Sequence, residues 1–292
     1  MDRRRPRFLR IVITAVVPAV ALFTGLGLAT TATASTTPAA TQRAEAAAVA
    51  RAAIKNLVVG FEHAPTAHKV STRSTGIKGL SQVESTNWSG YADTGSSFSK
   101  VSADWTEPTG TCSGRTESLA AFWVGIDGYS SSTVEQDGTL IECYEGTAYY
   151  YDWWEIYPEN DVQVVNDVSP GNSIAASVVR SGDSYTLAVT DSSDSADSFS
   201  TTQTYSGAAD SSAEWIAEAP CCVSGDTVYP LTDFHSWTSS SSDVTEGSTS
   251  GTISSFTDDE ITMIDNSDAV KAQPGSLNSS GNSFAVTWDR AS

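Results

Sequence analysis

The amino-acid sequence predicts an all-β fold from residue 85 to the C-terminus, built as a sandwich of two antiparallel sheets. Two observations predict it. Short segments of strand-like, alternating residues recur along this part of the chain, and Gly, Ser, Asn and Asp separate them. No apolar repeat of helical period runs through it for a useful length. A barrel is the second architecture that this pattern allows.

The expected strands follow one another with turn residues between them. NWSGY opens the series at Asn87, and a second segment alternates from Val101 to Trp105. The later segments are LAAFWVGI, AYYYDWWEIY, SIAASVVR, SYTLAVTD, SAEWIAE, GTISSF, EITMI and SFAVTW. Gly182 lies between SIAASVVR and SYTLAVTD, and glycine accepts the positive φ of a hairpin turn. Two Ser/Thr-rich stretches are predicted to be loops and exposed sheet faces: Ser192–Thr204 and Ser236–Ser255.

The first 34 residues have the composition of an export signal. Five arginines precede an apolar run from Ile11 to Leu28, and the small residues Ala32 and Ala34 then frame a cleavage site. The arginines before Phe8 faintly resemble a twin-arginine signal, which leaves the export route open. We expect residues 1–34 to be removed and the mature protein to be secreted, without a membrane segment.

Residues 35–84 differ in kind from the predicted sandwich. They contain an Ala-rich, helix-forming segment from about Thr41 to Gly60, followed by a basic connector. A basic helical segment between an export signal and an acidic domain is typical of an inhibitory pro-segment, and a plain linker is the alternative. We hypothesise that this segment binds the acidic domain and leaves it when carboxylates are protonated.

Charge is distributed unevenly along the chain. The formal net charge is −19, but 31 of the 35 acidic residues and only five of the 16 basic residues follow Glu84. Such a surface repels nucleic acids and anionic membranes. Its carboxylates repel one another less in acid, which favours an acidic working environment, although a soluble secreted protein can be acidic for other reasons.

Four cysteines are consistent with an oxidising compartment. Cys112 and Cys143 flank the segment richest in aromatic residues and could join its ends, whereas Cys221 and Cys222 are adjacent and their partners stay undetermined. His235 is the single histidine after the basic segment, and no CxxC pair occurs. The sequence therefore predicts neither a metal nor another cofactor.

Nucleophilic mechanisms are poorly supported by the residues present. Ser-His-Asp and Cys-His sites need a histidine base. His235 is the one candidate after the basic segment, but the sequence contains no GxSxG motif, and we interpret His235 as structural. Carboxyl groups remain as the candidates for acid–base chemistry. In SAEWIAE, strand alternation places Glu214, Ile216 and Glu218 on one face, although a solvated outer face would explain this pattern equally well.

Aromatic and acidic residues are concentrated between Phe122 and Pro158. Alternation places Trp123 on the same face as Asp127, and likewise Glu155 on the same face as Tyr157. Aromatic side chains beside carboxylates suit a binding surface, and a sandwich core is the alternative that this pattern leaves open.

Four separated motifs resemble the eqolisin, or glutamic peptidase, family. They are WVGIDG (123–128), EQDG (135–138), WWEIYP (153–158) and AEWIAE (213–218), in the family's order and spacing. NWSGY and WTEP (105–108) are also similar, so that the resemblance covers the chain from about Asn87 to Trp288. It implies a concanavalin-like sandwich of two antiparallel sheets and a pepstatin-insensitive endopeptidase active in acid.

The resemblance also implies roles for particular residues. Gln136 and Glu214 match the catalytic dyad: Glu214 would exchange protons with a bound water and the leaving amine, and Gln136 would hold that water and the oxyanion. Neither metal nor covalent intermediate is required. Five further residues match positions that line the substrate cleft: Trp88, Trp123, Asp127, Glu155 and Tyr157.

One departure from the family pattern and one competing function remain. The best-known members carry an aspartate four residues after the glutamine, where this chain has Leu140, with Glu142 close by. Subsite preference is therefore open. The competing class is a carbohydrate-binding or glycoside-hydrolysing sandwich protein, since aromatic faces stack on sugars and paired carboxyl groups cleave glycosides. That function would leave Gln136 unused. We expect polypeptides as substrates, the pro-segment as an intramolecular inhibitor, and a monomer.

Overall fold

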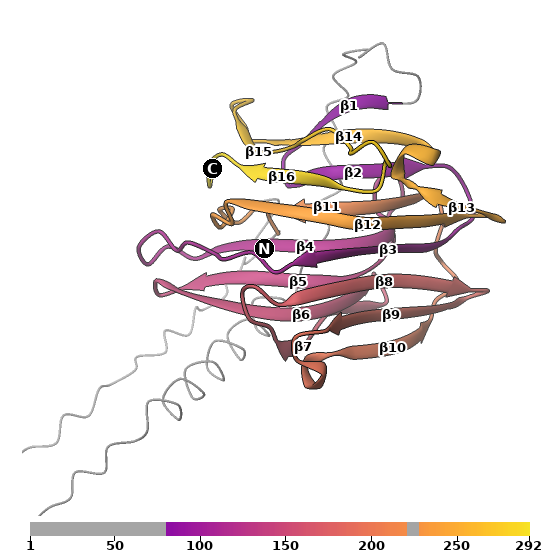
Figure 1. The fold of residues 1–292 in the computed structure, drawn as a ribbon, viewed down its shortest axis with the longest axis horizontal. Coiled ribbons are helices and arrows are strands. Elements are labelled where there is room, and N and C mark those ends of the chain that lie inside the picture. Colours follow the sequence, from indigo (N-terminus) through magenta and orange to yellow (C-terminus); the bar gives the residue numbers. More distant parts are fainter. Residues whose placement is uncertain (1–79, 221–227) are drawn as a thin grey trace, which may run out of the picture. The chain divides into compact units, whose positions relative to one another are not determined.

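The computed structural model describes residues 80–220 and 228–292, which form strands and their connections (Figure 1). The predicted export signal, most of the predicted pro-segment, Cys221 and Cys222 lie outside the described residues. The first strand begins at Leu80, a few residues before the boundary predicted from composition, because residues 80–85 pair with residues 258–263. No helix in the described ranges is long and apolar enough to cross a membrane.

Sixteen strands and two short 3-10 helices make up the described residues. In chain order they are β1 (Leu80–Ser85), β2 (Trp88–Thr94), β3 (Phe98–Thr106), β4 (Ser118–Asp127), β5 (Val134–Tyr144), β6 (Thr147–Tyr157), β7 (Asn160–Asp167), β8 (Ser173–Ser181), β9 (Ser184–Asp191), η1 (Ser195–Asp197), β10 (Phe199–Thr204), β11 (Ser212–Glu218), β12 (Ser236–Glu246), β13 (Thr249–Thr252), η2 (Ile253–Ser255), β14 (Thr257–Ile264), β15 (Val270–Pro274) and β16 (Phe284–Trp288).

The strands form two sheets that pack face to face (Figure 1). The first sheet has the order β7-β6-β5-β4-β11-β2-β14, and its neighbours are antiparallel, with β1 added in parallel to β14. The second sheet has the order β10-β9-β8-β3-β12 and is antiparallel. These two sheets confirm the predicted sandwich.

β12 belongs to both sheets. Its first residues, Ser236–Ser239, pair with β16, which continues through β15 to β14 of the first sheet. From Ser240 onward it pairs with β3 of the second sheet, after a register shift between Ser240 and Asp243. A strand that changes partner in this way joins the two sheets at one edge.

The hydrophobic core lies between the sheets. Phe122 and Val124 of β4 and Trp215 of β11 contribute to it from the first sheet, and Val101 of β3 contributes from the second. Phe122 stacks on Trp237 of β12 with ring centroids 5.5 Å apart. The opposite face of the first sheet is also buried and carries a second aromatic cluster that includes Trp88 and Trp123. Burial on both faces explains why LAAFWVGI is almost continuously apolar.

Several strands were not predicted from the sequence. β5 and β7 are rich in polar residues, and β10 and β12 lie within the Ser/Thr-rich stretches that were interpreted as loops and exposed faces. β12 alternates on each side of the register shift between Ser240 and Asp243, with Trp237 and Val244 buried and Thr238 exposed. Pairing with neighbouring strands outweighs weak intrinsic β-propensity in these segments.

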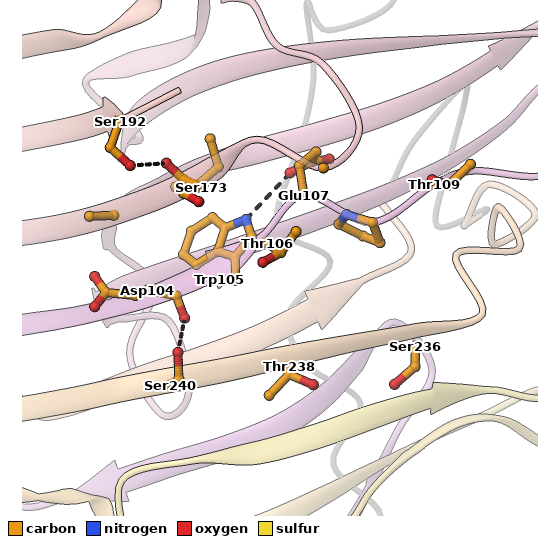
Figure 2. A pocket seen from close by; sticks show the side chains of 14 residues that line it. Asp104, Trp105, Thr106, Glu107, Thr109, Ser173, Ser192, Ser236, Thr238 and Ser240 are labelled. Atoms are coloured by element: carbon orange, nitrogen blue, oxygen red, sulfur yellow. Dashed lines mark hydrogen bonds between the residues drawn. The ribbon is translucent and has the colours of Figure 1, made fainter. Parts of the chain in front are cut away.

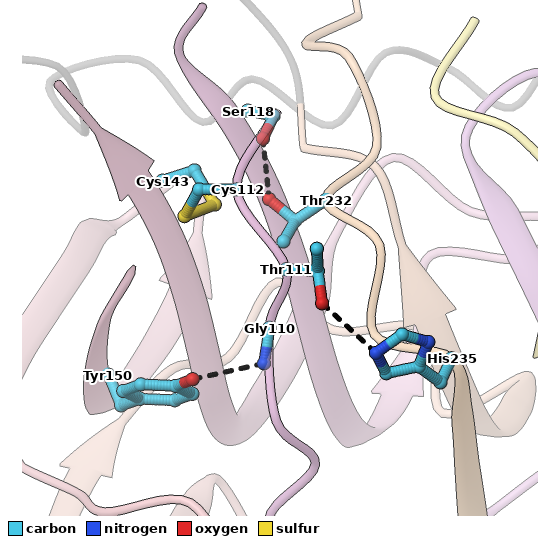
Figure 3. Close-up of a disulfide and its surroundings, with 8 residues drawn as sticks. All are labelled: Gly110, Thr111, Cys112, Ser118, Cys143, Tyr150, Thr232 and His235. Carbon is cyan, nitrogen blue, oxygen red and sulfur yellow. Dashed lines mark hydrogen bonds between the residues drawn. A yellow bond between two sulfur atoms is a disulfide. The ribbon is translucent and has the colours of Figure 1, made fainter. Parts of the chain in front are cut away.

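Cys112 and Cys143 form a disulfide that joins the segment before β4 to the end of β5 (Figure 3). His235 lies nearby on the surface, where its Nε2 is 3.0 Å from the Thr111 hydroxyl and its Nδ1 is 3.3 Å from the Asp233 carboxylate. These contacts agree with the structural interpretation of His235.

Candidate active site

A row of directly paired residues crosses the first sheet and brings the predicted dyad together. Glu214 of β11 is opposite Gly125 of β4, Gly125 is opposite Gln136 of β5, and Gln136 is opposite Glu155 of β6. Residues that are directly paired across a sheet project from the same face. Glu214 and Gln136 therefore share a face and lie on strands about 10 Å apart, given the usual strand spacing.

Gly125 keeps the space between the two dyad residues open. A Cβ atom at this position would lie 2.9 Å from the Trp123 ring and 3.2 Å from Cβ of Gln136. Any larger residue would push against the side chain of Gln136 or against the neighbouring ring. The glycine of WVGIDG therefore lets the side chains of Glu214 and Gln136 approach each other across β4.

Glu155 fixes the orientation of the Gln136 amide. Nε2 of Gln136 donates a hydrogen bond of 2.6 Å to Oε2 of Glu155, and both side chains are buried. The amide group is planar, so a hydrogen bond from one N–H to a fixed carboxylate also fixes the directions of the amide oxygen and of the second N–H. Glu155 is thus a positioning partner of Gln136 in this structure.

Glu214 is fully buried, and neither of its carboxyl oxygens has a hydrogen-bond partner among the described residues. Burial raises the pKa of Glu214 well above its ordinary value, the nearby Ser212 hydroxyl opposes this, and the carboxyl groups of Asp127, Glu135 and Asp93 raise it further. A buried carboxyl group without a partner is costly for stability and is common at sites where protons are transferred.

Trp88 and Trp123 pack beside the dyad row. Their rings meet edge to face with centroids 5.0 Å apart, and Nε1 of Trp123 donates to Oε2 of Glu218 at 2.8 Å. Asn87 donates to the other oxygen of Glu218 at 3.2 Å. Glu218, which sequence alternation placed on the same face as Glu214, therefore orients Trp123.

Asp127 has a position that its sequence pattern did not indicate. Its buried carboxylate accepts hydrogen bonds from the backbone N–H groups of residues 209, 210 and 211, at 2.7, 2.7 and 2.8 Å. The Ser211 hydroxyl donates a fourth bond at 2.8 Å. These contacts hold the segment that leads into β11 against the end of β4. The predicted role of Asp127 in binding substrate stays a prediction.

Tyr157 lies two pairing positions from Glu155, opposite Val134, on the face that carries Gln136. Its side chain is half-buried at the end of β6. Of the seven predicted site residues, the structure therefore gathers Gln136, Glu214, Glu155, Trp123, Trp88 and Tyr157 on one face of the first sheet, and places Asp127 at the adjoining end of β4.

Two residues near the dyad were missed from the sequence. Asp259 of β14 is opposite Ala92, which is itself opposite Glu214, so Asp259 extends the same row. The Tyr129 hydroxyl donates to Oδ2 of Asp259 at 2.5 Å, and the charges of Asp259 and Glu214 both act on its phenol. Only the strand register reveals this proximity, because TDDEITMI contains several acidic residues that sequence alone cannot distinguish.

A polar cavity of about 830 Å³ lies elsewhere, on the second sheet (Figure 2). Hydroxyl groups from β3, β8, β12 and adjacent loops line it, and Nε1 of Trp105 donates to Glu107 at its wall. Trp105 is only 3% exposed, so its ring is not available for stacking on a ligand. No strand that lines this cavity carries Gln136 or Glu214, and the cavity is therefore separate from the candidate active site.

The described residues contain no group of three or more His, Cys, Asp or Glu side chains that could hold a metal ion. On the dyad face, the carboxyl group of Glu214 can transfer a proton, and the oriented amide of Gln136 can donate hydrogen bonds.

Comparison with known proteins gives consistent results. Residues 86–288 match the model of the peptidase A4 family. Aspergillopepsin-2 of Aspergillus niger is 29% identical over an alignment of 188 residues, and the match covers 56% of this chain. The match spans 65% of that relative's length.

Two solved structures resemble the described fold. Scytalido-glutamic peptidase, in complex with a peptide-based transition-state analogue, matches with a TM-score of 0.60. SCP-B, a member of the eqolisin family in complex with the tripeptide Ala-Ile-His, matches with a TM-score of 0.59. Each is 22% identical, and each comparison covers 70% of this chain and 98% of the other. At this identity the likeness shows that the fold is shared.

Proposed function

The chain belongs to the peptidase A4 family, as its motifs predicted, and on this premise we propose that it is a secreted endopeptidase that hydrolyses peptide bonds with a Gln136/Glu214 dyad. The observation that carries the proposal is the row in which Glu214, Gly125 and Gln136 are directly paired. A water molecule between the carboxyl group and the amide would contact both.

The proposed reaction needs no covalent intermediate. Glu214 accepts a proton from the water, which attacks the carbonyl carbon of the scissile bond. The second N–H of the Gln136 amide donates to the oxyanion that forms, while the first stays bonded to Glu155. Glu214 then gives the proton to the leaving nitrogen, and the C–N bond breaks to release an amine and a carboxylic acid.

Glu214 must be ionised to act as this base. Burial favours its protonated form, whereas hydrogen bonds from water and from a bound peptide favour the carboxylate and lower its pKa. We therefore expect Glu214 to ionise when water and substrate are present, and we expect its pKa to set the acidic limit of kcat/KM. This would allow hydrolysis in acid, where a histidine base would be charged.

Proteolysis can be tested by incubating the full chain with a denatured protein from pH 2 to 7 and identifying the products by mass spectrometry. We expect internal cleavage that resists pepstatin, chelators and serine-directed reagents. The variants E214Q and Q136A should each lose at least about 10²-fold in kcat while remaining folded, which thermal unfolding at the assay pH verifies. Full activity in either variant would refute the dyad.

Retention on insoluble polysaccharide, with no peptide product at any pH tested, would instead support the carbohydrate-binding alternative. Controls for carry-over protease are the two inactive variants, purified in parallel with the wild type.

We further propose that residues 1–34 direct export and that residues 35–84 inhibit the enzyme until acid releases them. The disulfide between Cys112 and Cys143 supports an extracellular location. Precursor that keeps the same length and activity from neutral to acid pH would exclude the inhibitory role of the pro-segment.

A further inference from the structure

Glu142 is a buried carboxyl group that the proposed mechanism does not use. It lies on β5, six residues from Gln136 and on the same face, opposite Leu119 of β4 and Tyr149 of β6. Its side chain has no exposed surface, and neither oxygen has a hydrogen-bond partner in the described part of the chain. A solitary buried carboxylate is strongly destabilising unless a partner neutralises it.

Two other polar groups converge on Glu142. Glu117 precedes β4, and Tyr229 precedes the segment that bridges to Leu119. Oε1 of Glu117 and the Tyr229 hydroxyl are both buried without a hydrogen-bond partner among the described residues. The residues opposite Glu142 on the flanking strands, Leu119 and Tyr149, bring no charge.

The Glu117 carboxyl group acts electrostatically on Glu142, and both carboxyl groups act on the phenol of Tyr229. Burial, together with the smaller effect of the Glu117 carboxyl group, raises the pKa of Glu142 to about 8. Burial also raises the pKa of Glu117. For Tyr229, burial and then the charges of Glu117 and Glu142 raise the pKa to about 12.

Within residues 80–220 and 228–292, no ion pair joins a basic side chain to Glu142 or Glu117, and a cation would complement their charge. The nearest basic residue in sequence, Arg115, is exposed and pairs with the exposed Glu145 at 3.2 Å. An ammonium or guanidinium group has several N–H donors and a positive charge, which together would satisfy two carboxylates and a phenol.

We propose that Glu142, Glu117 and Tyr229 form a pocket for the cationic side chain of a lysine or arginine. The pocket lies on the dyad face at the distance spanned by six strand residues, roughly 20 Å from Gln136. A polypeptide running along the strands from the dyad therefore reaches it with its sixth residue or so. The cation comes from a substrate or from the basic segment 35–84 of the chain itself.

Binding depends on pH because a cation favours the ionised carboxylates. Its entry displaces the proton from Glu142, so affinity rises as the pH increases toward 8 and falls in acid as Glu142 and Glu117 become protonated. The pocket holds a basic side chain near neutral pH and releases it in acid. Only the identity of the occupant rests on the proposed peptidase function.

Agmatine, a small alkylguanidinium, is a suitable probe. Its binding to the full chain is measured by calorimetry at pH 5 and pH 8, beside E142Q and the control E145Q, which changes an exposed carboxylate on the same hairpin. A further variant of the full chain has every lysine and arginine of residues 35–84 replaced by glutamine. Thermal midpoints of all variants verify folding.

One result shows a pocket that substrates can fill. In it, agmatine binds the wild type at pH 8 and releases protons, and E142Q binds agmatine at least about 30-fold more weakly. Binding that is seen only in the chain with the neutralised basic segment shows that this segment occupies the pocket. In both cases E145Q binds as its parent does. Absence of binding to either chain at pH 8 overturns the proposal and leaves two carboxyl groups that share a proton. Because no catalysis is involved, failure here is distinguishable from failure of the dyad.

Discussion

At the scale of single residues, Asp127 separates two interpretations that sequence cannot distinguish. Its motif predicts a substrate contact, whereas its carboxylate accepts three backbone N–H bonds and one hydroxyl bond from residues 209–211. The variant D127N replaces one acceptor oxygen by a donor NH₂ group, which must face N–H groups. We expect a loss of about 2–4 kcal/mol in the free energy of unfolding, measured by urea denaturation.

The kinetic consequence distinguishes the two roles further. If Asp127 positions β11, D127N lowers kcat by displacing Glu214, with little change in KM. D183N, which alters an exposed turn carboxylate, should leave both stability and kinetics unchanged. A D127N enzyme of unchanged stability and strongly raised KM would support substrate binding instead.

At the scale of strands, the disulfide ties the segment before β4 to the end of β5 across 31 residues of sequence. Replacing both cysteines by serine removes a constraint on the unfolded chain, and loop-closure entropy predicts a loss of about 3–4 kcal/mol in unfolding free energy. Urea denaturation of C112S/C143S, compared with the wild type before and after reduction, measures it. An unchanged urea midpoint would show that the bond adds nothing to the stability of this sheet.

Strands also show what the sequence could and could not predict. Alternation correctly placed Glu155 with Tyr157 and Glu214 with Glu218, because side-chain direction follows from parity within one strand. Parity does not predict the direction of the Asp127 side chain, because β4 ends at this residue, where a φ of 70° turns the chain. The pairing of Glu214 with Gly125 joins segments far apart in sequence, and register between such segments depends on packing of the whole sheet. The dyad could thus be named from motifs, but its geometry could not be derived from them.

At the scale of the whole domain, buried carboxyl groups predict how stability varies with pH. Burial raises the pKa of Asp93 and Glu135 to about 9 and that of Glu107 to about 8. Asp137 is raised in the same direction by burial, and all four side chains are at most 1% exposed. The folded state therefore binds more protons than the unfolded state wherever the unfolded carboxyl groups have ionised.

The sign of the dependence follows directly. Stability from these groups is fully present below the unfolded pKa of about 4 and is lost progressively as the pH rises to about 9. Burial lowers the pKa of Lys271 to about 8, and its titration changes stability only above that value. We expect urea and thermal midpoints of the full chain to fall steadily from pH 4 to pH 8. Equal stability at both values would contradict the prediction.

One substitution isolates this effect from the net acidic charge. Glu135 is buried, and neither of its carboxyl oxygens has a hydrogen-bond partner among the described residues. The variant E135Q keeps the shape of this side chain but cannot titrate. It should stabilise the domain by about 2–4 kcal/mol at pH 8 and change stability little at pH 3. E159Q, which neutralises an exposed carboxylate, serves as the matched control. If both variants stabilise the domain equally at pH 8, general charge repulsion, rather than buried carboxyl groups, limits its stability near neutrality.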